Sequence, residues 1–118
     1  GAPKGTAANQ RDLPRELRKK YEAVQVVGSG SFGVVLEAWQ LSNGSRITQR
    51  AIKLVHARHG STLTEKEIRR LDRECLLMSR LVNEKFVVTY VESGKAKNHQ
   101  VYWCVMDLIN GRPVDEVL

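Results

Sequence analysis

The sequence predicts an α+β fold, a five-stranded antiparallel sheet with one main helix packed on it. Three observations carry this prediction. Apolar runs joined by short glycine-containing turns fill residues 21–55, which is typical of consecutive antiparallel strands. A helix-capping signal at Thr64 is followed by apolar residues at steps of three and four. Two further apolar runs, at residues 86–92 and 100–109, supply the remaining strands.

The bulk composition fits one globular domain. The chain has 118 residues, of which 42% are hydrophobic and 27% are charged. The longest apolar runs are far shorter than the roughly 18 residues of a membrane-spanning helix, and the pattern of a secretory leader is absent. We therefore expect a cytoplasmic or nuclear protein with no membrane partner.

The net charge of +6 is concentrated in basic runs within residues 1–20 and 46–70. Surfaces that bind nucleic acid combine such runs with aromatic side chains on which bases stack. Aromatic residues are not interleaved with these runs, so a solvated basic face is favoured and no nucleic-acid partner is expected.

The cysteines and histidines do not suggest a metal site. Cys75 falls on the predicted helix and Cys104 in the last apolar run, so both are expected to be buried small hydrophobic residues in a reducing compartment. His56, His59 and His99 are scattered at spacings that do not suit metal coordination and are expected at the surface.

The N-terminal residues are expected to contribute little to the fold. Residues 1–12 are interpreted as a disordered tail or a remnant of cloning. Asp12 and Pro14 have the positions of a helix cap and an early helical proline, so a short helical start is predicted there. It leads into the first strand, at residues 21–27.

Three glycines at the spacing G-x-G-x-x-G lie between the first two apolar runs, in residues 28–33. Glycine permits a tight turn and a close approach of the backbone to a ligand, and successive free N–H groups can bind phosphate oxygens. The pattern alone fits an ordinary surface turn equally well. Val34 and Val35 continue it as a strand, which argues against a dinucleotide fold, where a helix opens inside the motif.

The third strand, residues 46–55, carries a lysine on the side that should be covered. Asn43 and Gly44 predict the hairpin turn before it, since both tolerate positive φ. Lys53 is in phase with Ala51 by the period of two. A lysine there is costly to bury unless it meets an anion; the alternative is an ammonium that reaches water from a sheet edge. The anion is favoured because the same strands carry the glycine loop.

Thr64 and Glu67 form a capping box that opens a helix predicted to end near Leu81. Its apolar stripe consists of Ile68, Leu71, Cys75, Met78 and Val82. Glu74 lies beside the stripe and is either a plain solvated acid or the partner of an inward lysine. After the helix, a turn at residues 93–98 is expected to join the last two strands.

In combination these features resemble the amino-terminal lobe of a protein kinase of the eukaryotic type, of the Ser/Thr class. The resemblance is carried by Gly28-x-Gly30-x-x-Gly33-x-Val35, Arg50-Ala51-Ile52-Lys53, Glu74 on the helix, and a last strand that ends in Asp107. Arg50 departs from the V-A-I-K motif, which has valine there. The resemblance implies an ATP-binding lobe at residues 13–109, with a hinge and the truncated start of a second-lobe helix at 110–118.

The resemblance implies ATP as the ligand and assigns roles to single residues. The glycine loop would cover the phosphates, with Phe32 shielding them from water, while Lys53 contacts the α- and β-phosphates and Glu74 holds Lys53. Val35 and Ala51 would enclose the adenine. The implied ATP-binding residues are Gly28, Ser29, Gly30, Ser31, Phe32, Gly33, Val35, Ala51, Lys53, Met106, Asp107 and Ile109.

Five positions toward the back of the pocket and in the core also match the family pattern. Met106 resembles the residue at the back of the adenine pocket, and Asp107 would offer backbone groups to the adenine edge, as would Ile109. Met78 and Tyr90 match this lobe's half of the family's regulatory spine, although ordinary core packing explains both residues equally well.

The family's catalytic loop H-R-D-x-x-x-x-N and its D-F-G motif do not occur in this sequence. The resemblance therefore places the catalytic Asp and the Mg²⁺ ligands outside this chain, in a carboxy-terminal lobe. The parent protein is expected to be an ATP-dependent Ser/Thr kinase of unknown protein substrate, and this piece alone is expected to be inactive. The alternative is a pseudokinase, or a docking or regulatory module. Apolar surface at Val35, Met106 and Leu108 is expected to be exposed and to drive self-association.

Overall fold

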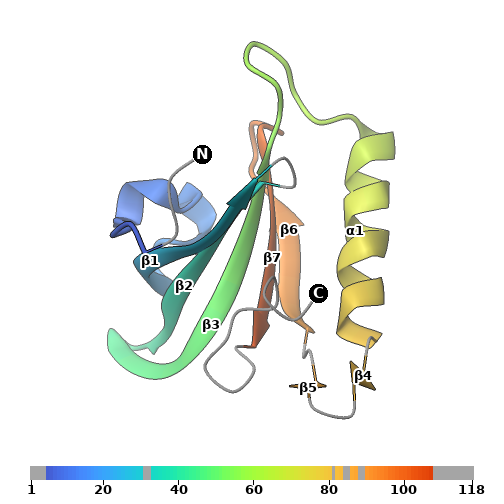
Figure 1. Ribbon diagram of the computed structural model, residues 1–118. Helices are drawn as coiled ribbons and strands as arrows, with labels where there is room; N and C mark the ends of the chain where they lie inside the picture. Colours follow the sequence, from blue (N-terminus) through green and yellow to red (C-terminus); the bar gives the residue numbers. More distant parts are fainter. Residues whose placement is uncertain (1–4, 31–32, 81, 84–85, 88–89, 108–118) are drawn as a thin grey trace.

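The fold is an antiparallel sheet with a long helix on one face. The computed structural model describes residues 5–30, 33–80, 82–83, 86–87 and 90–107. Five strands lie in the spatial order β1-β2-β3-β7-β6, and each neighbouring pair is antiparallel (Figure 1). The strands are β1 (Tyr21–Gly30), β2 (Gly33–Ser42), β3 (Ser45–His56), β6 (Tyr90–Lys95) and β7 (Val101–Asp107). The predicted α+β class and the five-stranded antiparallel sheet are confirmed.

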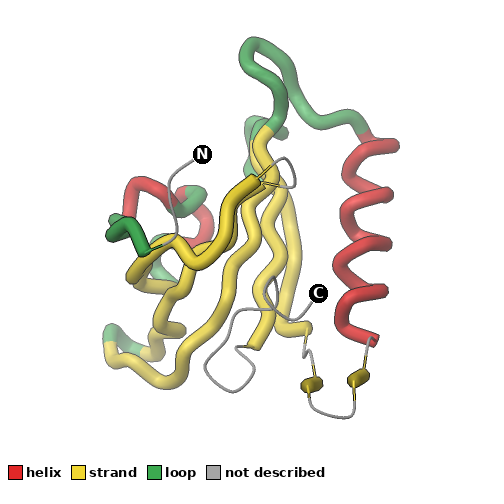
Figure 2. Tube along the Cα trace, in the orientation of Figure 1, coloured by secondary structure: helices red, strands yellow, loops and turns green. Residues whose placement is uncertain are grey.

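Helix α1 (Glu65–Arg80) begins at the predicted capping box and ends one residue before the predicted Leu81. The backbone N–H of Glu67 donates to Thr64 Oγ1 at 3.1 Å, and the N–H of Thr64 donates to Glu67 Oε1 at 3.0 Å. Figure 2 shows the helix alongside one face of the sheet. Its stripe residues Ile68, Leu71 and Cys75 are buried, while the side chains of Met78 and Val82 lie outside the description.

The sequence predicts one strand at residues 86–92, and the structure differs. After α1, β4 (Val82–Asn83) and β5 (Phe86–Val87) form a separate two-stranded sheet. The main-sheet strand β6 begins only at Tyr90 and continues to Lys95, through part of the segment predicted as a turn.

Gly94 explains why a turn signal lies inside a strand. It pairs with Trp103 of β7, and a Cβ at Gly94 would lie 2.7 Å from the Trp103 ring. The indole therefore packs directly on the glycine backbone, a close approach that glycine permits within a strand. The turn itself follows β6, at residues 97–100.

The β2–β3 hairpin turns where it was predicted to. Asn43 has a φ of 51° and Gly44 a φ of 80°, so both central residues of the turn adopt the left-handed conformation.

The N-terminal segment covers the sheet face opposite α1, so the predicted disordered tail is wrong for residues 5–12. The Val26 N–H donates to the Thr6 carbonyl at 2.8 Å, and the Ala8 N–H donates to the Val24 carbonyl at 3.0 Å. Two 3₁₀ turns follow, η1 (Gln10–Asp12) and η2 (Arg15–Leu17). The segment's apolar side chains join the core of this face, whose buried members are Leu13, Leu17, Tyr21, Val26, Leu36, Ala38, Ile52, Leu54, Ala96, Trp103 and Val105.

The predicted helix cap at Asp12 is not found; Asp12 is instead the last residue of η1. Its carboxylate accepts from the Asn9 N–H at 2.9 Å, while the Asn9 side chain accepts from the Arg11 N–H at 2.9 Å. The two residues thus form a capping box around η1. Asn9 caps that turn, and Pro14 precedes η2.

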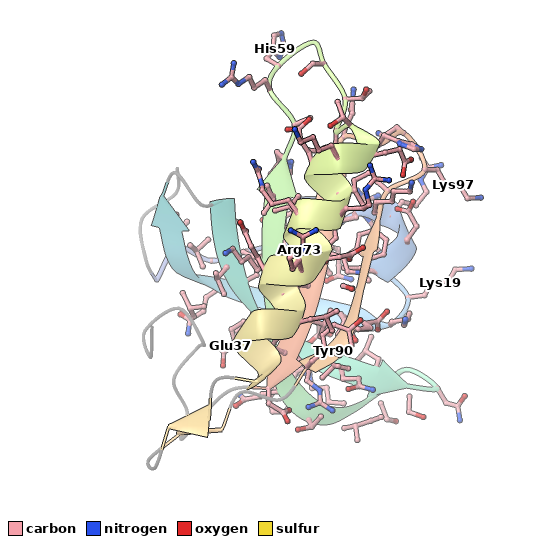
Figure 3. The ribbon with its side chains drawn as sticks, turned by 90° about the vertical axis from the view of Figure 1, so that its right-hand side faces the viewer. Lys19, Glu37, His59, Arg73, Tyr90 and Lys97 are labelled. Atoms are coloured by element: carbon pink, nitrogen blue, oxygen red, sulfur yellow. A yellow bond between two sulfur atoms is a disulfide. The ribbon has the colours of Figure 1, made fainter. Side chains whose placement is uncertain are left out.

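The other sheet face carries a second core, which we call the α1 cluster. It consists of Leu63, Ile68, Leu71, Cys75, Tyr102, Cys104 and Met106. Its members come from α1, from β7 and from the loop before the helix, so the two faces of β7 serve two separate cores because side chains alternate along a strand. The exposed Arg73 of α1 faces away from this cluster (Figure 3).

Of the three residues expected to form an exposed apolar surface, two do not. Val35 is 2% exposed and Met106 is 1% exposed, while Leu108 lies outside the described residues, as does the segment 110–118. Large exposed apolar side chains occur instead at Ile47 and Leu76. Across the described helices, none combines the length and the apolar character needed to cross a membrane.

Candidate functional site

The glycine stretch joins β1 and β2 as a hairpin whose two arms meet at the pair Gly30 and Gly33. Ser31 and Phe32, at its tip, lie outside the described residues. Gly33 has a φ of 117°, and a Cβ there would lie 2.2 Å from the carbonyl oxygen of Leu54. The hairpin backbone thus passes against β3 at a distance that only glycine allows.

Lys53 lies on the sheet face that α1 covers. It is directly opposite Val35 on β2 and directly opposite Cys104 on β7. It lines a cavity of about 20 Å³, room for a single water molecule. The other residues that line this cavity are Val55, Leu71, Glu74, Cys75, Tyr102 and Cys104. Sequence phase had placed Lys53 on the covered side, and the structure agrees.

Glu74 reaches the same cavity from α1. Its side chain is 58% exposed, and its carboxylate lies 3.9 Å from the guanidinium of Arg70, four residues earlier on the helix. An exposed ion pair of that spacing contributes about 0.3–0.5 kcal/mol. The fold therefore brings Lys53 and Glu74 to one cavity, and a direct ion pair between them stays a prediction.

The residues predicted to surround adenine also come together. Ala51 on β3 is directly opposite Met106 on β7, and both are buried. Val35 and Ala51 form a small buried cluster with Val27 of β1. Ile109 lies outside the described residues. Strand register places Val35, Ala51 and Met106 on the same stretch of the sheet as Lys53.

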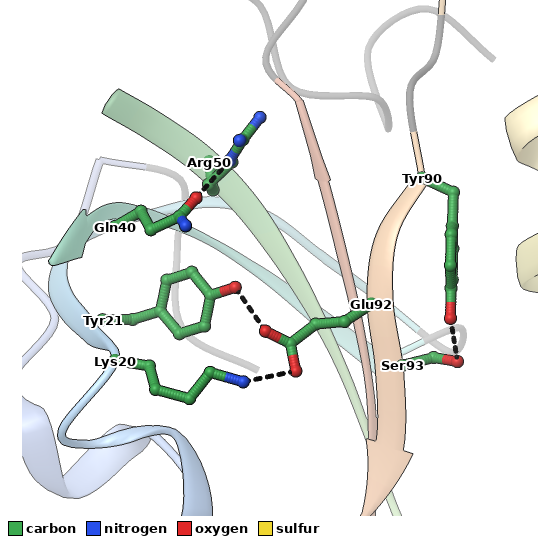
Figure 4. A network of polar contacts seen from close by, with 7 residues as sticks. All are labelled: Lys20, Tyr21, Gln40, Arg50, Tyr90, Glu92 and Ser93. Carbon is green, nitrogen blue, oxygen red and sulfur yellow. Dashed lines mark hydrogen bonds and ion pairs between the residues drawn. The ribbon is translucent and has the colours of Figure 1, made fainter. Parts of the chain in front are cut away.

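Asp107 forms an ion pair with Arg50, a contact that sequence reasoning missed. The two residues are directly opposite each other on β7 and β3. Arg50 Nε also donates to Gln40 Oε1 at 2.8 Å (Figure 4). The departure from V-A-I-K at Arg50 thus has a structural partner at the end of β7. The opposite charges of Arg50 and Asp107 were the available signal, but the sequence did not show that their two strands pair.

A buried tyrosine links α1 to the sheet beside the cavity. The hydroxyl of Tyr102 donates to Asp72 Oδ1 at 2.7 Å. Burial raises the pKa of the Tyr102 phenol, and the Asp72 carboxylate raises it further. Ser93 Oγ lies 3.5 Å from the same carboxylate and 2.9 Å from the hydroxyl of Tyr90 (Figure 4). Tyr90 packs against the α1 cluster, which ordinary core packing also explains.

The two cysteines form a disulfide, so their assignment as reduced residues is wrong. The bond joins Cys75 of α1 to Cys104 of β7, and both side chains are buried as predicted. Sequence placed each one in an apolar stretch, but only the packing of the helix on the sheet brings the two sulfur atoms together. No group of three or more metal-ligating side chains occurs in the part of the chain that the structure describes.

Comparison with known proteins gives one informative similarity. No protein-family model matches the chain. The chain is similar to a protein from Dictyostelium discoideum described as probable serine/threonine-protein kinase fhkA, with 28% identity over 102 residues. The match covers 86% of this chain and only 16% of the length of that protein. This similarity supports a kinase-like region and leaves the finer assignments as proposals.

Proposed function

We propose that this chain is the ATP-binding lobe of a protein kinase that transfers the γ-phosphate of ATP to Ser and Thr hydroxyls of proteins. The observation that carries the proposal is the close passage of the glycine hairpin over β3, with Gly33 against the Leu54 carbonyl and Lys53 as the neighbouring residue. The hairpin and Lys53 thus lie on neighbouring strands, where the proposal has both of them contact the same anion. The similarity to a kinase of Dictyostelium discoideum supports this class of function.

We infer that the ligand of this site is a nucleoside triphosphate, on the following grounds. The backbone of the glycine hairpin donates hydrogen bonds to phosphate oxygens, and Lys53 adds a positive charge on the adjoining strand. Glu74 orients the lysine from α1. Val35, Ala51 and Met106, all buried in this structure, form the apolar group beside Lys53 that would contact a purine ring. These residues bind and orient ATP; catalysis of this type depends on such positioning and on electrostatic stabilisation.

The proposal assigns the catalytic Asp and the Mg²⁺ ligands to a second lobe outside this chain. Bound Mg²⁺ would neutralise charge on the phosphates, and a carboxylate would receive the proton of the substrate hydroxyl. We expect the 118-residue chain to bind nucleotide without transferring phosphate.

Nucleotide affinity of the chain tests the proposal directly. Lys53→Met should weaken binding of a fluorescent ATP analogue at least about tenfold, since a charge-assisted contact to phosphate is lost. Lys97→Met is the matched control, because Lys97 is an exposed lysine in the turn after β6 and is not among the residues that line the Lys53 cavity. Equal affinity of wild type and Lys53→Met would contradict the assigned role.

The alternative is a pseudokinase or a docking module without phosphate transfer. The longer parent protein distinguishes the two. A kinase carries H-R-D and D-F-G beyond this lobe and loses phosphate transfer in Lys53→Met. A parent protein that binds nucleotide but transfers no phosphate supports the pseudokinase, and one that binds no nucleotide supports the docking module.

A further inference from the structure

The Cys75–Cys104 disulfide is a covalent link between α1 and the sheet. The two Cα atoms are 6.5 Å apart, and the residues are separated by 29 positions in sequence. Cys75 is 4% exposed and Cys104 is 2% exposed, so the link lies inside the α1 cluster. The geometry of helix against sheet therefore depends on the redox state of these two sulfur atoms.

The link lies at the candidate nucleotide site. Cys104 is directly opposite Lys53 in the β3–β7 ladder, and Cys75 follows Glu74 in α1. All four side chains line the same cavity of about 20 Å³. A change in the distance between α1 and β7 at this point must change the separation of Lys53 and Glu74.

The non-covalent polar ties of α1 to the sheet lie nearer its N-terminus. In the part of the chain described, Asp72 accepts the hydrogen bond from Tyr102, and Glu65 lies 3.5 Å from Lys95. The disulfide follows them, in the turn that carries Glu74. Without it, that turn is held to the sheet by apolar contacts of Leu71 and Cys75 with β7.

We propose that Cys75 and Cys104 are a reversible redox site that controls how firmly α1 is held beside Lys53. The disulfide holds Glu74 at the Lys53 cavity and favours nucleotide binding, because the site is already organised. The dithiol form releases this turn of the helix and weakens nucleotide binding. The effect on nucleotide rests on the proposed function; the redox site and the helix response do not.

Hydrogen peroxide is the class of oxidant that balances the reaction. The thiolate of one cysteine attacks a peroxide oxygen, the O–O bond breaks, and a sulfenic acid and one water result after protonation. The second thiol then attacks the sulfenic sulfur, the S–S bond forms, and a second water leaves with the remaining proton. In total two thiols and one peroxide give one disulfide and two waters. A small dithiol reverses the step by thiol–disulfide exchange and becomes a disulfide itself.

Hydrogen exchange of the whole chain, oxidised with peroxide or reduced with a dithiol, tests the redox site. Oxidation should remove two hydrogen atoms from the intact mass. Reduction should accelerate amide exchange in residues 65–80 at least about tenfold, while exchange in β2 stays unchanged as an internal reference. The doubly substituted chain, Cys75→Ala with Cys104→Ala, should show no response to either reagent. The comparison of the two wild-type forms needs no variant, so a poorly folded variant does not affect it.

Two results would overturn the redox site: an unchanged mass when the reduced chain is treated with peroxide, or equal exchange of α1 in both forms. A second measurement, of nucleotide affinity, distinguishes a failure of the redox site from a failure of the proposed function. Affinity for the fluorescent ATP analogue should fall at least about threefold on reduction. If neither form binds nucleotide, the proposed function fails while the helix response still supports the redox site. If both forms bind equally while α1 differs, control of the site by the disulfide is wrong.

Discussion

The hydroxyl of Tyr21 donates a hydrogen bond of 2.7 Å to the carboxylate of Glu92 (Figure 4). Tyr21 begins β1 and Glu92 lies in β6, and these are the two edge strands of the five-stranded sheet. The sheet therefore curls enough for side chains from its opposite edges to meet. Lys20 Nζ donates to the other oxygen of the carboxylate at 2.7 Å. The Glu92 carboxylate therefore connects β6 to the start of β1 through two hydrogen bonds.

Glu92 should make stability depend on pH in the acid range. Burial alone would raise the pKa of Glu92, but hydrogen bonds from Lys20 and Tyr21 outweigh it and hold the pKa below the ordinary value of 4.5. A lowered folded pKa means that stabilisation is present above pH 4.5 and is lost as pH falls through the folded value. Denaturant midpoints from pH 7 to pH 3 should therefore fall more for wild type than for Glu92→Gln. Glu22→Gln, which breaks an exposed ion pair with Arg46, is the control and should behave like wild type.

Gly33→Ala should damage the glycine hairpin. The methyl group would lie 2.2 Å from the Leu54 carbonyl, at a φ of 117° that alanine rarely adopts. We expect a loss of about 1–3 kcal/mol in the free energy of unfolding, together with weaker nucleotide binding. Gly44→Ala is matched in its positive φ but meets no atom within 4 Å, so it should cost less and leave nucleotide affinity unchanged. Equal losses in the two variants would contradict the steric argument.

Tyr102→Phe should loosen α1. It removes the hydrogen bond to Asp72 while keeping the ring in the α1 cluster, and a hydrogen bond to a charged group contributes about 1.5–3 kcal/mol. Equilibrium unfolding measures the loss, and amide exchange in α1 should show where it occurs. Tyr90→Phe removes only a bond between two hydroxyls, to Ser93, and should cost less.

Leu17→Ala should be strongly destabilising, because the N-terminal segment is part of the core. Leu17 is buried beneath the sheet face opposite α1. Truncation of a buried leucine costs about 2–5 kcal/mol. Ile47→Ala removes an apolar side chain of similar size that is 56% exposed, and should change stability by less than about 0.5 kcal/mol. Similar thermal midpoints for the two variants would mean that this segment does not support the fold in solution.

Self-association of the isolated chain stays a prediction, with a revised surface. Because Val35 and Met106 are buried, they do not drive self-association, while Ile47 and Leu76 are large exposed apolar side chains that could. Light scattering should show a molar mass that rises with concentration, and Ile47→Lys should reduce that rise. A constant monomer mass at high concentration would refute the prediction.

Local signals predicted the elements whose causes are local. The Thr64–Glu67 capping box, the Asn43–Gly44 turn and the continuation of a strand from Gly33 each depend on neighbouring residues, and the structure has each of them at the expected place. Gly94 misled the prediction because its cause is distant: the Trp103 ring on the adjoining strand needs a residue without a Cβ. The same holds for residues 5–8, whose small side chains gave no sign that their backbone pairs with β1.

The sequence by itself determined the α+β class, the glycine hairpin, and the side of the third strand on which Lys53 lies, because hydrophobic period and turn chemistry act within a few residues. Only the tertiary structure decided that Cys75 meets Cys104, that Arg50 meets Asp107, and that Glu74 shares a cavity with Lys53. Those contacts join segments far apart in the chain. They follow from strand register and from the docking of α1, which the chain adopts to bury two apolar faces at once and which no short stretch of sequence encodes.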